Sequence, residues 1–173
     1  GTYPIIISVP ETANYLAATE NISLVIETAD FIGITFNDAS FTYDGNSHSI
    51  FVNGAPAGAT VTYTGNAQTN TGVYTVDALI QMPNYNDLQL SATLTIDNAV
   101  FTGITFNNGS FTYDGTAHSI FVNGAPVGAT VTYTGNGQTN IGTYTVNASV
   151  QMPNYNDLQL SATMTIDNAT ITG

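Results

Sequence analysis

Two histidines are the residues of this chain best suited to acid–base chemistry, and each lies next to other reactive types. His48 follows Asp44 by four residues and precedes Ser49, and His118 has the same neighbours at the same spacing. These residue types are compatible with a Ser-His-Asp nucleophilic triad. Within one turn and one strand, however, adjacent side chains alternate between faces. We therefore interpret each histidine as a polar residue that closes the turn after Tyr-Asp-Gly.

Carboxylates offer the second kind of chemistry, because their hard oxygens are ligands for calcium. Asp97 and Asp167 occupy equivalent places near the ends of two similar segments. The sequence has no D-x-[DN]-x-[DN]-G loop, and turn aspartates commonly bond to their own backbone. Calcium at Asp97 and Asp167 is therefore a hypothesis, with solvated aspartates as the alternative. No other cofactor is expected, and zinc lacks cysteine partners for the two histidines.

Modification by glycan is a third possibility. Four Asn-x-Ser/Thr triplets, which match the N-glycosylation pattern, begin at Asn21, Asn108, Asn147 and Asn168. In a chain this rich in Asn and Thr such triplets also arise by chance, and Thr has the alternative role of a strand-forming residue.

The composition excludes many functions. The 173 residues include 12 Asp plus Glu and 2 His but no Lys, Arg, Cys or Trp, so the formal net charge is −12. A nucleic-acid partner needs cations, a Schiff base needs Lys, and thiol chemistry needs Cys. No apolar run is long enough for membrane insertion within this segment. An anionic surface without Lys or Arg resists trypsin-like proteases and indicates an extracellular or cell-surface protein.

The chain contains an internal repeat of 70 residues. Segments 31–100 and 101–170 align without a gap, with 14 mismatches over the 69 positions from Ile32 to Val100. The block 81–93 recurs unchanged as 151–163. Such identity indicates a recent tandem duplication.

Shorter segments flank the two repeats. Residues 1–30 align with the C-terminal half of a repeat, since residues 1–3 (GTY) correspond to 142–144, and residues 171–173 align with the opening of a further repeat. We interpret the chain as part of a longer protein. The alternative is that the half-repeat supplies strands to a neighbouring chain, as in donor-strand polymers.

Within each repeat the apolar residues follow a period of two, which is typical of strands with one buried face. The pattern predicts six strands in the first repeat, near 32–36, 40–43, 48–53, 59–64, 73–81 and 88–97, separated by Gly, Asn, Asp and Pro turns. No segment has a helical period. Tyr43, Tyr63, Tyr74 and Tyr85 fall at strand positions that favour a core role over an exposed sugar-stacking platform.

The predicted fold is all-β, with tandem small β-sandwich (Ig-like) modules of about 70 residues. The alternative is a β-grasp-like sheet without a substantial helix. A single core of this size is marginally stable, so contacts between neighbouring repeats are expected to contribute.

Several motifs together resemble the MBG-type repeats of bacterial surface proteins and adhesins. They are residues 41–45 (FTYDG), 59–66 (ATVTYTGN), 91–96 (SATLTI) and 142–146 (GTYTV). The resemblance implies a tandem extracellular β module that serves as a spacer or stalk, and it carries over no catalytic residue.

Two functional hypotheses follow. The first is a non-enzymatic structural repeat protein that forms an adhesin stalk or the body of an extracellular fibre, with neighbouring repeats and copies of itself as partners. The second is a module that binds a glycan or a host protein through loops 53–58 and 65–71. An enzyme is disfavoured, because no acid, base and nucleophile cluster within either repeat.

Overall fold

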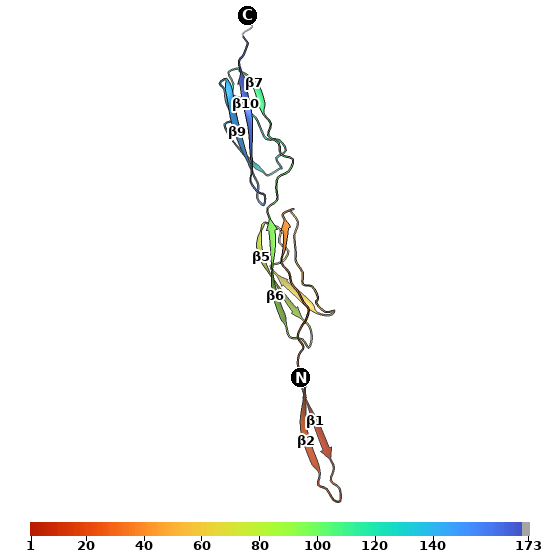
Figure 1. Cartoon of the computed structure of the whole chain (residues 1–173). Helices are drawn as coiled ribbons and strands as arrows, with labels where there is room; N and C mark the ends of the chain where they lie inside the picture. The colour runs from red at the N-terminus through yellow and green to blue at the C-terminus, as the bar shows by residue number, and fades with distance from the viewer. Residues whose placement is uncertain (171–173) are drawn as a thin grey trace. The chain divides into compact units, whose positions relative to one another are not determined.

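The computed structural model describes residues 1–170, and those residues form ten strands and no helix, hence none that could span a membrane. The predicted opening of a further repeat at 171–173 lies outside the described residues. The strands are β1 (Thr2–Val9), β2 (Ala18–Val25), β3 (Ala39–Thr42), β4 (Thr60–Thr64), β5 (Gly72–Gln81), β6 (Leu88–Asp97), β7 (Gly109–Thr112), β8 (Thr130–Thr134), β9 (Gly142–Gln151) and β10 (Leu158–Asp167) (Figure 1). The all-β prediction is therefore confirmed.

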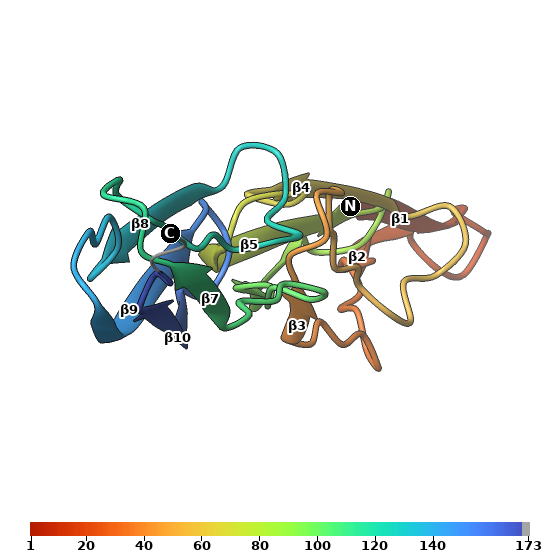
Figure 2. The same ribbon diagram turned by 90° about the horizontal axis from the view of Figure 1, so that it is seen from above.

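Each repeat builds one four-stranded sheet, and the two sheets have the same strand order. The orders are β3-β6-β5-β4 in the first repeat and β7-β10-β9-β8 in the second. In the second repeat β9 pairs antiparallel with both β8 and β10, whereas β7 pairs parallel with β10. Figure 2 labels these four strands. The first and last strands of the repeat are thus hydrogen-bonded neighbours.

The chain divides into two compact units whose limits do not follow the repeats. The first unit combines residues 1–38, 49–66 and 75–94, and the second combines 39–48, 67–74 and the chain from Thr95 onward. The second repeat therefore lies wholly within one unit, which makes it the clearer example of the module.

The core of the second repeat lies on one face of its sheet. Alternation along β9 and β10 buries Val146, Val150, Met164 and Ile166 almost completely. Ile120 joins this core from outside the sheet, and the side chains of Phe106, Phe111, Tyr133 and Tyr144 pack around the cluster. The second layer of the sandwich is consequently an irregular segment on either side of Ile120.

Two of the six strands predicted per repeat are not formed. Segments 32–36 and 48–53 make only the isolated bridges Thr35↔Asn53 and His48↔Gln68. The apolar residues of these segments do alternate, and several of them are at least partly buried, but the segments form no hydrogen-bonded ladder. The other four predictions agree with β3, β4, β5 and β6 to within one residue at each end.

Side chains take the place of the missing ladder. Asn136 accepts a hydrogen bond from the backbone N–H of Ile120 at 2.9 Å and donates to its carbonyl oxygen at 2.7 Å, and the hydroxyl of Tyr133 accepts from the N–H of Val122 at 2.9 Å. The equivalent residue in the first repeat, Asn66, makes the same pair of bonds to Ile50. A polar backbone segment can therefore cover an apolar core with its hydrogen bonds satisfied.

Glycine is required just before this asparagine. Gly135 has a φ of 82°, and a Cβ there would collide with the carbonyl oxygen of Thr145 on β9. The tight approach holds the turn against the sheet, and the next residue then reaches Ile120.

The asparagine clamp can be tested by substitution. Asn136→Ala orphans the N–H and the carbonyl of Ile120, and each unsatisfied group costs about 1–3 kcal/mol. We expect the free energy of unfolding of the second repeat, measured with urea, to fall by roughly 2 kcal/mol or more. Gln159→Ala, which removes an exposed hydrogen bond to Ser149 on the opposite sheet face, should change it by less than about 0.5 kcal/mol. Equal effects of the two substitutions would contradict the clamp.

Candidate functional site

Each histidine pairs with the aspartate four residues before it. His48 Nε2 lies 3.0 Å from Asp44 Oδ1, and His118 Nε2 lies 3.1 Å from Asp114 Oδ1. The ring of His48 stacks on Phe41 with centroids 4.5 Å apart. Both histidine side chains are mostly covered, whereas their aspartates are about half exposed. The pair closes the turn, as interpreted from the sequence.

The carboxylates of these turns are held in the charged form by local hydrogen bonds. The pKa of Asp44 is lowered mainly by the backbone N–H of Asn46 and by its side-chain amide, with a smaller contribution from His48. The pKa of Asp114 is lowered mainly by the hydroxyl and the backbone N–H of Thr116. These bonds lie within one turn, which is the local geometry that turn aspartates favour.

The aspartates proposed for calcium each have a serine partner. Asp97 accepts a hydrogen bond from the hydroxyl of Ser40 at 2.6 Å, and Asp167 accepts one from Ser110 at 3.0 Å. Each bond ties the first strand of a repeat to the last. Across residues 1–170 no three acidic or histidine side chains converge on one point. Calcium at Asp97 and Asp167 stays a prediction, and the described carboxylates provide no multidentate cage for it.

The four candidate glycosylation asparagines are exposed. Asn21 lies on β2 and Asn147 on β9. Asn108 accepts a hydrogen bond from the N–H of Thr163 at 2.8 Å, so its side chain also fixes the segment before β7 to β10. Asn168 follows the end of β10. Their modification stays a prediction.

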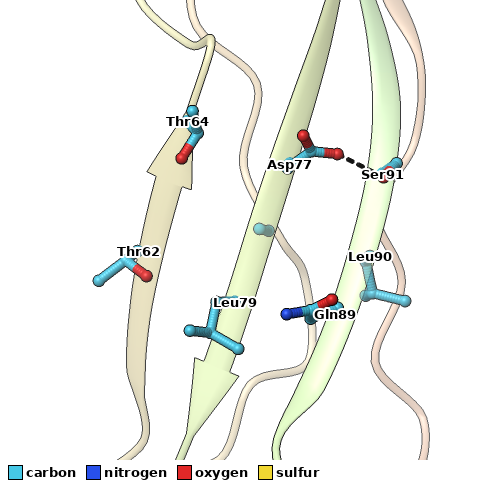
Figure 3. A pocket seen from close by; sticks show the side chains of 8 residues that line it. Thr62, Thr64, Asp77, Leu79, Gln89, Leu90 and Ser91 are labelled. Atoms are coloured by element: carbon cyan, nitrogen blue, oxygen red, sulfur yellow. Dashed lines mark hydrogen bonds between the residues drawn. The ribbon is translucent and has the colours of Figure 1, made fainter.

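The outer face of the first sheet carries an open trough of about 420 Å³. Its polar side chains lie on β4, β5 and β6 (Figure 3), and Asp77 accepts a hydrogen bond from the hydroxyl of Ser91 at 2.5 Å. Two of its residues, Asp77 and Leu79, are Asn147 and Ser149 in the second repeat. The trough is lined by Thr62, Thr64, Asp77, Ala78, Leu79, Gln89, Leu90 and Ser91.

A smaller groove of about 210 Å³ lies in the first unit, beside one of the loops expected to bind ligands. Gly54 and Pro56 of that loop contribute to it, together with Phe31 and Tyr85. In the second expected loop, by contrast, Asn66 is committed to the backbone of Ile50. The two loops therefore do not share one role.

The most extensive polar contacts between residues of different repeats centre on the β9–β10 turn. The N–H of Ala99, in the linker 98–100 that joins β6 to the second repeat, donates to the carbonyl of Asn154 at 2.9 Å. The N–H of Asn156 donates back to the carbonyl of Ala99 at 2.9 Å. Asn154 adopts the left-handed conformation at φ 67°, which Asn tolerates better than most residues. The turn and the linker are thus joined through backbone groups on both sides.

The side chain of Asn154 extends this contact to the first repeat. Its Oδ1 accepts from the backbone N–H of Thr71 at 3.0 Å and from the Thr71 hydroxyl at 3.1 Å. Its Nδ2 donates to Asn70 Oδ1 at 3.2 Å. One asparagine therefore bonds to two consecutive residues that lie more than 80 positions earlier in the chain.

Aromatic rings cover the same turn. Tyr155 stacks on Phe101 with centroids 4.8 Å apart, and Tyr43 meets it edge-on at 5.9 Å. Such pairs contribute about 0.5–1.5 kcal/mol beyond simple burial. We call the set Thr71, Ala99, Phe101, Asn154 and Tyr155 the junction.

A matching contact occurs where residues 28–31 meet the β5–β6 turn. The N–H of Ala29 donates to the carbonyl of Asn84 at 2.9 Å, and Phe31 stacks on Tyr85 at 4.9 Å. Asn84 is also left-handed at φ 67°. The junction geometry is therefore a repeated feature.

Sequence reasoning treated the Pro-Asn turns only as turns and missed the junction. The available signal was the unchanged block 81–93, which contains Asn84 and recurs with Asn154. The four tyrosines predicted as core residues, Tyr43, Tyr63, Tyr74 and Tyr85, are half-buried in the structure, and the hydroxyls of Tyr63 and Tyr74 bond to the backbone at Val52 and Asn70.

A comparison with protein families finds one family model, described as MBG domain, that matches residues 33–100 and again residues 102–170. This confirms the resemblance noted in the sequence. No curated protein matches the chain.

The solved structures that match this chain have low sequence identity and low TM-scores. Human protocadherin-24 EC1-2 is 8% identical with a TM-score of 0.33, and the match covers 80% of this chain and all of that one. The I67–I69 fragment of titin is 9% identical with a TM-score of 0.34, over 80% of this chain and 65% of that one. Drosophila N-cadherin EC1-4 is 8% identical with a TM-score of 0.28, over 95% and 58%.

The turn carboxylates predict a dependence of stability on pH. Because the folded-state pKa values of Asp44 and Asp114 are lowered from 3.8, their contribution is fully present above that pH and is lost as pH falls through the lower folded values. We expect the melting temperature, followed by circular dichroism, to fall less steeply below about pH 4 in the Asp44→Asn/Asp114→Asn variant. Glu11→Gln/Glu27→Gln removes equal charge outside the turns and should preserve the wild-type slope. An unchanged slope in the turn variant would contradict the assignment.

The junction predicts different effects for two substitutions of Asn154. Asn154→Gly keeps the left-handed backbone and removes only the bonds to Thr71 and Asn70, so the Thr71 amide should exchange with solvent roughly tenfold faster while the melting temperature of the second repeat holds. Asn154→Ala adds backbone strain of about 1–2 kcal/mol and should lower that temperature as well.

The equivalent substitutions of Asn84 are the matched control. These substitutions change the equivalent turn of the first repeat, and the side chain of Asn84 makes no bond to Thr71. Nuclear magnetic resonance exchange of the Thr71 amide distinguishes the two sites. If Asn154→Gly left that exchange unchanged, the junction would have no energetic role.

Proposed function

This chain belongs to the MBG domain family, and from that premise we propose that it is a non-enzymatic extracellular structural protein whose tandem modules bear load. The finer assignment we propose is the stalk of a bacterial surface adhesin or the body of an extracellular fibre. The proposal is argued from the strand pairing, the junction and the surface, in that order.

The parallel pairing of the first and last strands is the observation that carries the proposal. β7 pairs with β10 in the register Gly109↔Met164 to Thr112↔Asp167. The chain enters this pair at one end and leaves it at the other, so tension on the two ends of the module acts along the strands. The hydrogen bonds are then sheared together, whereas an antiparallel hairpin pulled at one end would open bond by bond.

The bonds at the exit of this pair support the same interpretation. The N–H of Tyr113 donates to the carbonyl of Asp167 at 2.9 Å, next to the Ser110 to Asp167 side-chain bond. In the first repeat Tyr43 and Ser40 make the same two bonds to Asp97. We call this pair of bonds the exit clamp, and it occurs in both modules.

The junction supports transmission of load from one module to the next. Its bonds to Ala99 are backbone bonds, and its aromatic stack involves Phe101 directly after the linker. A linker fixed in this way has little slack to extend before the modules themselves are loaded.

The surface supports an extracellular setting. With no Lys or Arg and a formal net charge of −12, it offers trypsin-like proteases no cleavage site and repels other anionic surfaces. Exposed strand positions such as Thr60, Thr62 and Thr64 are polar without charge, so solubility does not depend on ion pairs that salt would screen.

Single-molecule pulling on the two ends of the full chain tests the load-bearing role. Tyr113→Pro removes the N–H of the exit clamp in the second repeat, and Tyr113→Ala keeps it while removing the partly exposed ring. We expect two module unfolding events in the wild type. In the proline variant one event should become about tenfold faster at a given force, which corresponds to a loss of about 1.4 kcal/mol.

The unchanged first repeat is an internal reference in the same molecule. Its unfolding should keep the wild-type rate in both variants. A clear pair of unfolding events shows that the proline variant still folds. If Tyr113→Ala weakened the module as much as Tyr113→Pro, the exit clamp would not carry the load, and the proposal would lose its main support.

A further inference from the structure

The hairpin formed by β1 and β2 has an apolar face that no other described segment covers as a sheet layer. All sixteen residues of its two strands are exposed. The large apolar side chains of one face keep between 42% and 55% of their surface accessible, far more than their counterparts in the repeats. They are Tyr3, Ile5, Ile7, Val9, Ile22, Leu24 and Ile26.

The register identifies what this hairpin corresponds to. β1 pairs with β2 so that Tyr3 faces Leu24. β9 pairs with β10 so that Tyr144 faces Met164, which are the residues aligned with Tyr3 and Leu24. The two hairpins therefore present matching faces, except that Glu20, opposite Ile7, stands where the second repeat has Leu160 opposite Ala148.

In the second repeat this face is the core. Val146 and Met164 have no accessible surface, because Ile120 and the rings of Phe106, Phe111 and Tyr133 pack on them. All four covering residues come from the segment 101–141, which we call the half-module. The same chain therefore contains a segment whose side chains bury a face of this kind.

The unpaired outer edges of β1 and β2 also match the half-module. In the second repeat the half-module also supplies the strands at both sides of the hairpin, β7 beside β10 and β8 beside β9. β1 and β2 form a two-stranded sheet with both outer edges unpaired. A hairpin of this size is marginal alone, and unpaired edges and a large apolar patch both favour a protein partner.

We propose that the apolar face of β1–β2 is a docking surface for a polypeptide with the residue pattern of the half-module, 101–141. That partner would bury the exposed side chains and add one parallel strand along β2 and one antiparallel strand along β1. The interaction is a β-augmentation at two edges combined with core completion.

The side chains of the hairpin also set a size requirement on the partner. Ile7 and Ile22 stand where the second repeat has Ala148 and Ala162. Larger residues on one side of a packed core require smaller ones opposite, because overpacking typically costs about 1–3 kcal/mol. The half-module 101–141 itself should therefore fit less well than a relative with smaller apolar side chains.

A second copy of this chain fits the surface less well. In each copy residues 101–141 already cover their own sheet. Two hairpins packed face to face would bury apolar area but leave their outer backbone edges without partners.

Hydrogen exchange measured by mass spectrometry tests the proposal with the full chain. The probe is a synthetic polypeptide with the sequence of residues 101–141, added at up to about 100 μM. We expect exchange in β1 and β2 to slow at least tenfold, with exchange in β3 to β10 unchanged. Ile7→Ala/Ile22→Ala restores the alanines of the repeats and should bind the same probe about tenfold more tightly.

Matched charge variants locate the surface. Ile5→Asp/Leu24→Asp on the apolar face should abolish the protection, whereas Thr19→Asp/Ser23→Asp on the opposite face should keep it. No protection of either the wild-type hairpin or the alanine variant would overturn the proposal. So would dimerisation of the chain alone that Ile5→Asp/Leu24→Asp abolishes, since a second copy would then be the occupant. These results are independent of the pulling experiment, which concerns the second repeat.

Discussion

Burial of one apolar sheet face is the requirement on which the rest of this structure depends. The four-stranded sheet of each repeat buries one face, and a module of about 70 residues has little other material with which to cover it. The cover is an irregular segment whose backbone must still find hydrogen-bond partners. The side chain of Asn136, positioned by Gly135, meets that demand at Ile120. At β1–β2, which no other segment among residues 1–170 covers as a sheet layer, the corresponding face is exposed.

The strand order that results from this cover has a mechanical consequence. Because the first strand of the module lies beside the last, the chain enters and leaves through a single parallel pair. Asp97 and Asp167, the aspartates predicted as calcium ligands, accept hydrogen bonds from Ser40 and Ser110 that reinforce this pair in each module. In the structure the histidines close turns and these aspartates tie strands, while calcium at the aspartates stays a prediction.

The asparagine and the tyrosine of the junction lie in the block that is unchanged between the two repeats. Residues 81–93 contain the end of a strand, the left-handed asparagine and the tyrosine that together contact the preceding linker. A change there would affect both the turn of its own module and its contact with the residues before it. The trough on the outer sheet face, by contrast, differs between the repeats at two of its residues, 77 and 79.

Periodicity and turn residues alone determined the all-β class, the repeat length and four strands of each module. They failed at 32–36 and 48–53, because alternating burial does not say whether a neighbouring strand or a side chain such as Asn66 satisfies the backbone. The sequence did not predict the junction, since Thr71 and Asn154 lie 83 residues apart and are brought together only by the tertiary structure. Local patterns fix which face of a strand is apolar. Only the tertiary structure decides what covers that face, because the covering residues are brought to it from distant parts of the chain.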